Sequence, residues 1–331
     1  MKKFLTLALI ISMCTFFSFA DASAKQVLKL GMGDPIDSDQ GALATRFKEI
    51  LEGLSNGEIQ VDLFPNGAIG TETEMLQNAR AGTLDFAIIG IGNAVPFVRE
   101  LGTLTMPYLI ENSYDAVKVT TGKLGKFWNT VASEKGGFRI VGWTYSNFRH
   151  LTNSVRPVTS LKDVKGLKIR IPQNNIILST LKAWDANPVP MAWSETFTAL
   201  QQGVVDGQDN PYIVNYTSKF HEVQTHLTEI HYQYSLQPLI MGTVTLDKFS
   251  PEMRDMVLRA GIEAQQYCIL FQTLEAEKAK QAMQANGVKV SYLTDEDEWR
   301  KKAVENVWPQ FYDFIGGKQN LDLVLKALGK S

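Results

Sequence analysis

Cysteine, histidine and basic charge are all scarce in this chain of 331 residues, and each scarcity excludes a class of protein. The 2 Cys and 4 His are too few for a disulfide scaffold or for a cysteine-rich zinc or iron–sulfur site. A formal net charge of −2 lacks the basic excess of a nucleic-acid-binding surface, so we expect no nucleic-acid partner. The hydrophobic share of 44% is ordinary for a folded protein, and this length suggests about two domains.

Several motifs of the common enzyme classes are also missing. The sequence contains no phosphate-binding Walker loop and no His-Glu-x-x-His zinc motif. Gly31-Met-Gly33 and Gly90-Ile-Gly92 each follow an expected strand, but neither continues as the Gly-x-Gly-x-x-Gly of a dinucleotide site. We therefore expect no catalytic residue, metal or cofactor, although Asp206, Asp209 and Glu195 leave an exported enzyme as an alternative.

The N-terminal segment has the composition of a secretory signal peptide. Lys2 and Lys3 precede an uncharged apolar run at positions 4–20, and Ala22-Ser-Ala24 provides small residues for a cleavage site near Ala24. The alternative is a membrane anchor, but the run is shorter than the ~20 apolar residues that a spanning helix needs. We predict a signal peptide at residues 1–24 and export to the periplasm.

The first third of the mature chain alternates strands with helices. Apolar spacing predicts, in order, strand 27–32, helix 40–54, strand 59–63, helix 71–81 and strand 84–90. This order predicts parallel pairing of the strands, with helices on both faces of the sheet.

The rest of the chain repeats this theme and adds a long helix. We expect strands at 138–143 and 166–172, helices at 174–184 and 194–202, a crossing strand within 231–246, a helix at 251–285, a strand at 288–293 and two final helices. The fold class is therefore α/β, with two lobes of mixed sheets flanked by helices and a ligand cleft between them.

The chain is expected to cross between these lobes more than once. We assign residues 25–146 and 236–275 to the first lobe, and residues 147–235 and 276–331 to the second lobe. The helix at 251–285 is longer than a typical globular helix and can span both.

Three side chains in the middle of the chain are candidates for ligand contact. Arg170 lies between Ile169 and Ile171 on a short strand, so it points away from any core that they face. Its guanidinium could clamp a carboxylate through two hydrogen bonds, or pair with an acidic residue at the surface. Trp193 could form a pocket wall or belong to the core. Asn210, which precedes a proline, could bind a ligand at a strand end or form a turn.

Several blocks of the sequence resemble the DctP-type solute-binding proteins of TRAP (tripartite ATP-independent periplasmic) transporters. In chain order the blocks are Gly70–Leu76, Gly82–Phe86, Phe148–Pro157, Gly166–Pro172, Pro190–Glu195 and Ala199–Pro211. Their order behind a signal peptide is more specific than any single block, and the resemblance extends from about Leu28 to Leu325.

The resemblance implies a two-lobed periplasmic-binding-protein clamp, similar to type II, with a long helix across both lobes. It implies capture of a small organic acid outside the inner membrane. The acid would pass to a small, DctQ-like and a large, DctM-like membrane subunit that use an ion gradient in place of ATP. We expect a monomer that is not an enzyme. Alternatives are an exported enzyme, the binding protein of an ATP-driven importer and a ligand sensor for a receptor.

The same resemblance places ligand-binding roles on particular residues. It implies that Arg170 pairs with the ligand carboxylate, that Arg149 assists in some members, and that Asn210 contacts the ligand. Glu72 corresponds to an acidic position of the first lobe, and Trp193 to an aromatic wall. The complete candidate set is Arg170, Arg149, Asn210, Trp193, Gln173, Glu72, Phe148, Tyr234 and Gln237.

Two glycines distinguish this chain from sialic-acid binders that it resembles. An acid and an asparagine of those proteins fall at or near Gly90 and Gly33, so a sugar acid would lose two polar partners. Aromatic residues would line the pocket instead, namely Trp193, Phe148, Tyr145 and Tyr234. We therefore expect a monocarboxylate with an apolar or aromatic body, with a C4-dicarboxylate or a sugar acid as alternatives.

Overall fold

The computed structural model describes residues 25–330. The predicted signal peptide at residues 1–24 lies outside the described residues. Within residues 25–330, no helix combines the length and the apolar character needed to cross a membrane.

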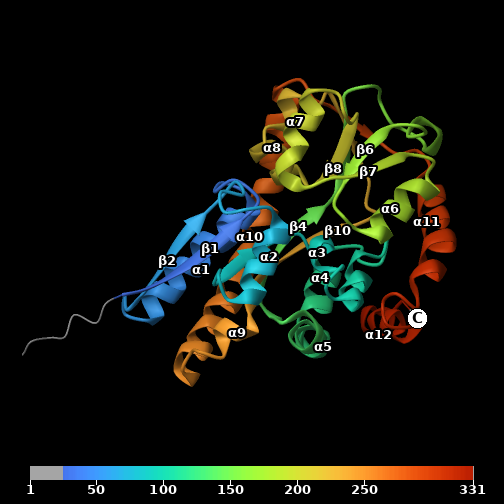
Figure 1. Ribbon diagram of the computed structural model, residues 1–331. Coiled ribbons are helices and arrows are strands. Elements are labelled where there is room, and N and C mark those ends of the chain that lie inside the picture. The colour runs from blue at the N-terminus through green and yellow to red at the C-terminus, as the bar shows by residue number, and fades with distance from the viewer. Residues whose placement is uncertain (1–24, 331) are drawn as a thin grey trace, which may run out of the picture.

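The first lobe is built on a mixed sheet (Figure 1). Its strand order is β2 (Ile59–Phe64), β1 (Gln26–Met32), β3 (Phe86–Ile88), β10 (Tyr234–Gly242) and β4 (Phe138–Phe148). β1 pairs in parallel with β2 and β3, as the alternation of strands and helices predicts. β10 runs antiparallel to β3 and β4, which makes the sheet mixed.

Successive residues of this sheet enter two different cores. On β3, Phe86 and Ile88 pack with apolar residues of α1 (Asp39–Leu54), whereas Ala87 packs with those of α2 (Glu72–Ala81). This is the alternation of a strand that is buried on both faces. The other helical segments of this lobe are α3 (Ile91–Ala94), η1 (Arg99–Thr105), α4 (Ser113–Thr120), α5 (Gly122–Val131), η2 (Ala132–Gly136) and α9 (Thr243–Leu246).

The second lobe has its own mixed sheet. The strand order is β11 (Lys289–Tyr292), β9 (His226–Glu229), β5 (His150–Asn153), β8 (Gly207–Asn210), β6 (Lys168–Ile171) and β7 (Asn187–Pro190). β5 runs antiparallel to β8 and β9, and the other neighbouring strands are parallel. Its helical segments are η3 (Leu161–Asp163), α6 (Asn175–Ala183), η4 (Trp193–Glu195), α7 (Thr196–Gln201), α8 (Tyr212–Thr217), η5 (Phe220–Glu222) and α11 (Glu296–Phe311).

Helix α10 (Pro251–Ala285) joins the two lobes, at the bounds that the sequence predicts. Ser250 caps its N-terminus and Pro251 occupies its first position, where a missing N–H costs no hydrogen bond. The helix packs against α1 and β4 of the first lobe and against α8 of the second (Figure 1). A two-lobed clamp with a long helix across both lobes is therefore confirmed.

Two local predictions differ from the structure. The helix predicted at 194–202 is shorter in the structure: its first two residues lie in the tight turn η4, and α7 begins after that turn. Helix α12 (Lys318–Leu328) falls in the range assigned to the second lobe, yet it packs against α4 and η1 of the first. Its apolar residues Leu321 and Val324 join the first-lobe core, so burial of that face determines where the helix lies.

Helix α10 lies very close to β4 because both elements have glycine at the contact. A Cβ atom on Gly261 would lie 2.2 Å from the carbonyl oxygen of Val141, and one on Gly142 would lie 2.8 Å from the carbonyl oxygen of Gly261. Both obstacles are backbone atoms, which cannot rotate away. A side chain at either position would therefore push the connecting helix off the sheet.

We predict that Gly261→Ala destabilises the protein by about 1–3 kcal/mol, the usual cost of overpacking. In thermal unfolding this corresponds to a melting temperature lower by several degrees. The matched control is Gly53→Ala in α1, because a Cβ atom there would meet no atom within 4 Å. Alanine also favours a helix over glycine, so the control should be neutral or stabilising. Equal melting temperatures for the two variants would contradict this account.

Candidate functional site

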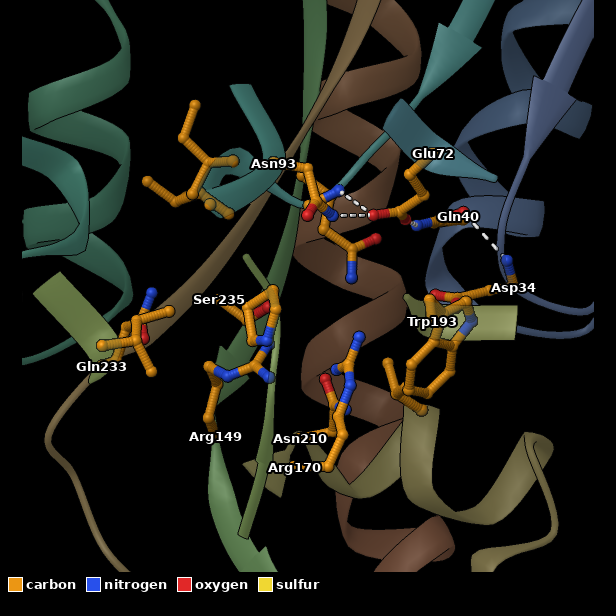
Figure 2. Close-up of a pocket in the computed structure, with 18 residues that line it drawn as sticks. Asp34, Gln40, Glu72, Asn93, Arg149, Arg170, Trp193, Asn210, Gln233 and Ser235 are labelled. Carbon is orange, nitrogen blue, oxygen red and sulfur yellow. Dashed lines mark hydrogen bonds between the residues drawn. The ribbon is translucent and has the colours of Figure 1, made fainter. Parts of the chain in front are cut away.

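The main pocket lies between the lobes, at the ends of strands from both sheets. It contains about 500 Å³ of space not filled by protein atoms, part of which opens to solvent. Its lining residues are Asp34, Gln40, Glu72, Gly90, Ile91, Gly92, Asn93, Arg149, Arg170, Pro172, Ile177, Trp193, Asn210, Val214, Gln233, Ser235, Leu236 and Gln237. In Figure 2 the guanidinium groups and Asn210 lie on one side, and Glu72, Gln40, Asn93 and Asp34 lie on the other.

Arg170 enters the pocket because of the alternation along β6. Ile169 and Ile171 are fully buried in the second-lobe core, so the side chain between them points away from it. Nε and Nη2 of Arg170 donate to the carbonyl oxygen of Met191 at 3.2 and 2.8 Å, and the guanidinium lies 5.4 Å from the ring centre of Trp193.

The charge of Arg170 has no acidic partner in this position. Only 3% of the residue is exposed, and no acidic side chain among residues 25–330 forms an ion pair with it. Burial, and then the like charge of Arg149, lower the pKa of Arg170 to about 10, so it remains a cation at neutral pH. A buried cation without a counter-ion is costly, and an anionic ligand would remove that cost.

Arg149, in contrast, is already paired. Its Nε donates to Oδ2 of Asp209 at 2.7 Å and its Nη2 to Oδ1 at 3.3 Å, while Tyr232 donates its hydroxyl to the same carboxylate. Burial by itself lowers the pKa of Arg149, but the charge of Asp209 outweighs this and raises it. Arg149 therefore brings little net positive charge to the pocket.

Asn210 is held by a chain of buried amides behind β8. Its Nδ2 donates to Oε1 of Gln208 at 2.6 Å, and Gln208 in turn donates to Asn215 at 2.8 Å. Asn215 donates back to the carbonyl oxygen of Asn210 at 2.7 Å, which closes the ring of contacts. An amide has two donors and an accepting oxygen, so Asn210 keeps hydrogen-bonding capacity for the pocket.

The first lobe presents an acidic wall centred on Glu72, the first residue of α2. Its carboxylate accepts hydrogen bonds from Gln40 Nε2 at 3.2 Å, from the Gly90 N–H at 3.1 Å and from the side-chain amide of Asn93. Burial raises the pKa of Glu72 despite these donors. Asp34 lies beside it, 3% exposed, and its backbone N–H donates to Gln40 at 3.1 Å.

Strand β10 adds polar side chains from the region that joins the lobes. Gln233, just before the strand, and Ser235 and Gln237 on it line the pocket, whereas Tyr234 belongs to the first-lobe core; Leu236 belongs to that core and also borders the pocket. The period of two along an extended chain explains this division. The side-chain oxygens of Gln233 and Gln237 are buried and have no hydrogen-bond donor among the described residues.

The lobes touch across the pocket, so the structure is a closed clamp. A Cβ atom on Gly33 of the first lobe would lie 3.0 Å from Trp193 of the second. Farther along, a Cβ atom on Gly92 would lie 3.5 Å from the side-chain amide of Asn174. Glycine at position 33 therefore leaves room for the tryptophan ring when the lobes close.

The structure brings six of the predicted residues into this pocket: Arg170, Arg149, Asn210, Trp193, Glu72 and Gln237. Gln173 is exposed and does not line it, because the next residue, Asn174, turns inward. Asn174 Oδ1 accepts the N–H groups of Ile176 and Ile177 and so caps α6.

Phe148 and Tyr234 do not line this pocket either. They lie opposite each other on β4 and β10, with ring centres 5.4 Å apart, and both belong to the first-lobe core. Tyr145 is buried in the same core, where its hydroxyl contacts Thr120. Among the pocket-lining residues Trp193 alone is aromatic, so the aromatic walls expected from the sequence are absent there.

Several polar lining residues were not predicted from the sequence. Asp34, Gln40 and Asn93 occupy loops and helix starts that have no recognisable motif. Gln233 and Ser235 share the spacing of Gln237, so the alternation along β10 was a signal that could have found them.

The described residues contain little that would support catalysis or metal binding. No group of three or more His, Cys, Asp or Glu residues within 25–330 has the arrangement of a metal site. A Gly-x-Ser-x-Gly string occurs at Gly53–Gly57, but it follows helix α1 and not a strand. Ser55 is the C-cap residue there, and its hydroxyl donates to the carbonyl oxygen of Glu52 at 3.1 Å.

Comparison with known proteins identifies the family. Residues 31–313 match the DctP family, described as bacterial extracellular solute-binding protein, family 7. The chain belongs to this family. It is a solute-binding protein of the TRAP type, as its sequence blocks predict.

Three relatives illustrate the range of ligands. The 2,3-diketo-L-gulonate-binding periplasmic protein YiaO of Escherichia coli K12 is 30% identical over 88% of each chain. The sugar acid binding protein DctPAm of Advenella mimigardefordensis, solved with galactonate, is 29% identical with a TM-score of 0.88, over 92% of this chain and 98% of that one. A TRAP periplasmic solute-binding protein of Sulfurospirillum deleyianum, solved with succinate, is 30% identical with a TM-score of 0.86. The match covers 92% of this chain and 99% of that one. The identities are similar, so the ligand must be inferred from the pocket.

We predict that Asp209→Ala lowers the free energy of unfolding by about 3–5 kcal/mol, because it leaves Arg149 buried without its counter-ion. Urea denaturation measures this change. The control is Asp247→Ala, which removes an exposed pair with Arg254 at 3.9 Å and should cost at most about 1 kcal/mol. Equal stability of the two variants would show that Arg149 does not depend on Asp209.

Proposed function

We propose that this protein captures a small hydroxylated monocarboxylic acid in the periplasm and delivers it to the small and large membrane subunits of a TRAP transporter. It binds the acid without converting it. The observation that carries this proposal is the buried cation Arg170, which faces the pocket without an acidic partner among the described residues.

The ligand carboxylate is placed against Arg170. A guanidinium forms strong, charge-assisted hydrogen bonds with a carboxylate, and two parallel bonds also fix its orientation. Nη1 of Arg170 has no hydrogen-bond partner among residues 25–330, and Asn210 lies beside it in the pocket. The ligand favours the closed form because only that form offers it both lobes at once.

The rest of the ligand is placed against groups that accept hydrogen bonds. Buried oxygens of Asp34, Gln233 and Gln237 have no donor in the described part of the chain, and Glu72 adds a carboxylate. Hydroxyl groups can donate to all of these, whereas an apolar body would leave them unsatisfied at a cost. This supports a polyhydroxylated acid, such as a sugar acid, over an acid with an apolar or aromatic body.

A C4-dicarboxylate is the second candidate, because Arg149 and Arg170 both line the pocket. Two observations disfavour it. Asp209 already neutralises Arg149, and a second carboxylate reaching the first lobe would face Glu72 and Asp34. Like charges repel strongly in a buried site, because little water is present to screen them.

We predict that sugar acids stabilise the protein more than C4-dicarboxylates do. The mature protein would be unfolded and refolded to remove any captured ligand, then heated with galactonate, shorter sugar acids or succinate. A ligand at 1,000 times its Kd adds about 4 kcal/mol, which raises the melting temperature by several degrees. A larger shift with succinate would support the dicarboxylate alternative, and the absence of a shift with any acid would contradict the proposed function.

We predict that Arg170→Ala weakens binding of the most effective acid by about 2–5 kcal/mol, since the carboxylate would be desolvated without a partner. Arg170→Lys should also weaken it, because lysine lacks the planar fork. Isothermal titration calorimetry gives the affinities. Arg259→Ala is the control, because Arg259 forms an exposed pair with Glu263 on α10. Unchanged affinity in both Arg170 variants would rule out the carboxylate clamp.

A further inference from the structure

Carboxyl groups outnumber guanidinium groups around this pocket. Asp34, Asp39 and Glu72 are all buried on the first-lobe side, and Asp209 lies on the other. Arg149 and Arg170 are the two cations that face them. An incoming carboxylate adds one more negative charge. A nearby like charge raises the pKa of a carboxyl group, so binding favours protonation of one of these acids.

Two of the first-lobe acids have donors that stabilise their ionised form. Glu72 accepts three hydrogen bonds, from Gln40, Gly90 and Asn93. Asp39 accepts the hydroxyl of Ser146 and is the first residue of α1, where the partial positive charge of a helix N-terminus favours an anion. Burial raises the pKa of both groups, and Asp39 Oδ1 is also buried without a donor among residues 25–330, but each carboxylate keeps at least one donor that favours its ionised form.

Asp34 has less such support. Its Oδ2 is buried and has no donor within hydrogen-bond distance among the described residues. Asp39 on α1 and Glu72 on α2 face it with like charge, while Arg149, Arg170 and the side chain of Gln237 on β10 favour its ionised form. Asp209 already neutralises Arg149, however, and Arg170 is the cation that a ligand carboxylate would neutralise.

A single proton on Asp34 would relieve several of these costs at once. It would remove the repulsion from Asp39 and Glu72 and turn an acceptor without a donor into a hydroxyl donor. Gln237, which faces Asp34, has an oxygen that also lacks a donor and could receive this hydroxyl.

We propose that Asp34 is a proton-binding residue of the ligand site, and that closure of the lobes over the acid takes up one proton from solvent onto its carboxylate. This inference rests on the proposed function. When the lobes open, the proton returns to solvent together with release of the acid.

Closure matters because it removes water from Asp34. The neighbouring residue, Gly33, is covered by Trp193 of the second lobe in the closed clamp, and Asp34 itself lines the pocket. Burial, followed by the charges of Asp39 and Glu72, raises the pKa of Asp34 well above its ordinary value. In an open clamp, water would reach the carboxyl and bring its pKa back toward that value.

The direction of the pH effect follows from this difference. Between the lower pKa of the open form and the higher pKa of the closed form, binding takes up a proton, so affinity rises as pH falls. The rise is at most about tenfold per pH unit for one proton. Above the closed-form pKa both forms are ionised, and the affinity no longer changes with pH at Asp34.

Calorimetry of ligand binding tests the proposal. The probe is galactonate, or the acid that gives the largest shift in the thermal screen, titrated between pH 5.5 and 8 in buffers of low and high ionisation enthalpy, such as PIPES and imidazole. The dependence of the heat on the buffer gives the number of protons taken up. We expect the natural protein to take up as much as one proton, with affinity rising toward low pH.

Asp34→Asn is the decisive variant, because an amide of the same shape can donate to Gln237 without a proton. We expect it to bind without the proton uptake at Asp34 and with a flatter pH profile. Asp37→Asn is the matched control: Asp37 is exposed in the same loop and does not line this pocket, so the uptake should persist. Contributions from histidines remain in both variants, so their difference isolates Asp34.

The contrary outcomes are distinct. Binding by the natural protein without proton uptake, or equal uptake in Asp34→Asn, would overturn the proposal while leaving the proposed function intact. If Asp34 instead accepts a ligand hydroxyl as a carboxylate, Asp34→Asn would weaken binding equally at every pH, which also overturns it. Failure of every acid to bind would overturn the proposed function and this inference with it. Thermal unfolding of each variant confirms that it is folded.

Discussion

The uncompensated charge of Arg170 is the constraint around which this protein is organised. A guanidinium that is 3% exposed, with no acidic partner among the described residues, is expensive unless something supplies the missing negative charge. The second lobe supports it only with the carbonyl oxygen of Met191 and the ring of Trp193. This is the feature on which the proposed binding of a carboxylate rests.

The surrounding structure limits which anion fits. The pair of Arg149 with Asp209 and the amide ring behind Asn210 make one wall rigid without adding net charge. The opposite wall offers acceptors from the loop before α1, from α2 and from β10, which suit hydroxyl groups. The lobes that carry these walls are joined by β10 and by α10, and glycine contacts seat α10 on β4.

Much of this arrangement was predictable from the sequence. Local apolar periodicity located the strands of the first lobe and its helices α1 and α2, and the bounds of α10 matched, but it did not locate α4 or α5. Arg170 was found because β6 is a short strand with isoleucine on either side, so its neighbours determine its direction. The predictions of site residues failed where the direction of a side chain depends on how it packs. Gln173 and Asn174 differ by one position, but only Asn174 turns inward to cap α6.

The sequence by itself determined the fold class, the family and the arginine that faces the pocket, because those depend on local periodicity and on motifs that are contiguous in the chain. Only the tertiary structure decided the character of the pocket. It buried Tyr145, Phe148 and Tyr234 in a core and turned Gln233, Ser235 and Gln237 toward the pocket. It also gathered Asp34 and Glu72 from distant segments and left Arg170 without an ion-pair partner within residues 25–330. Burial and charge balance are properties of groups brought together by folding, so no stretch of sequence could specify them alone.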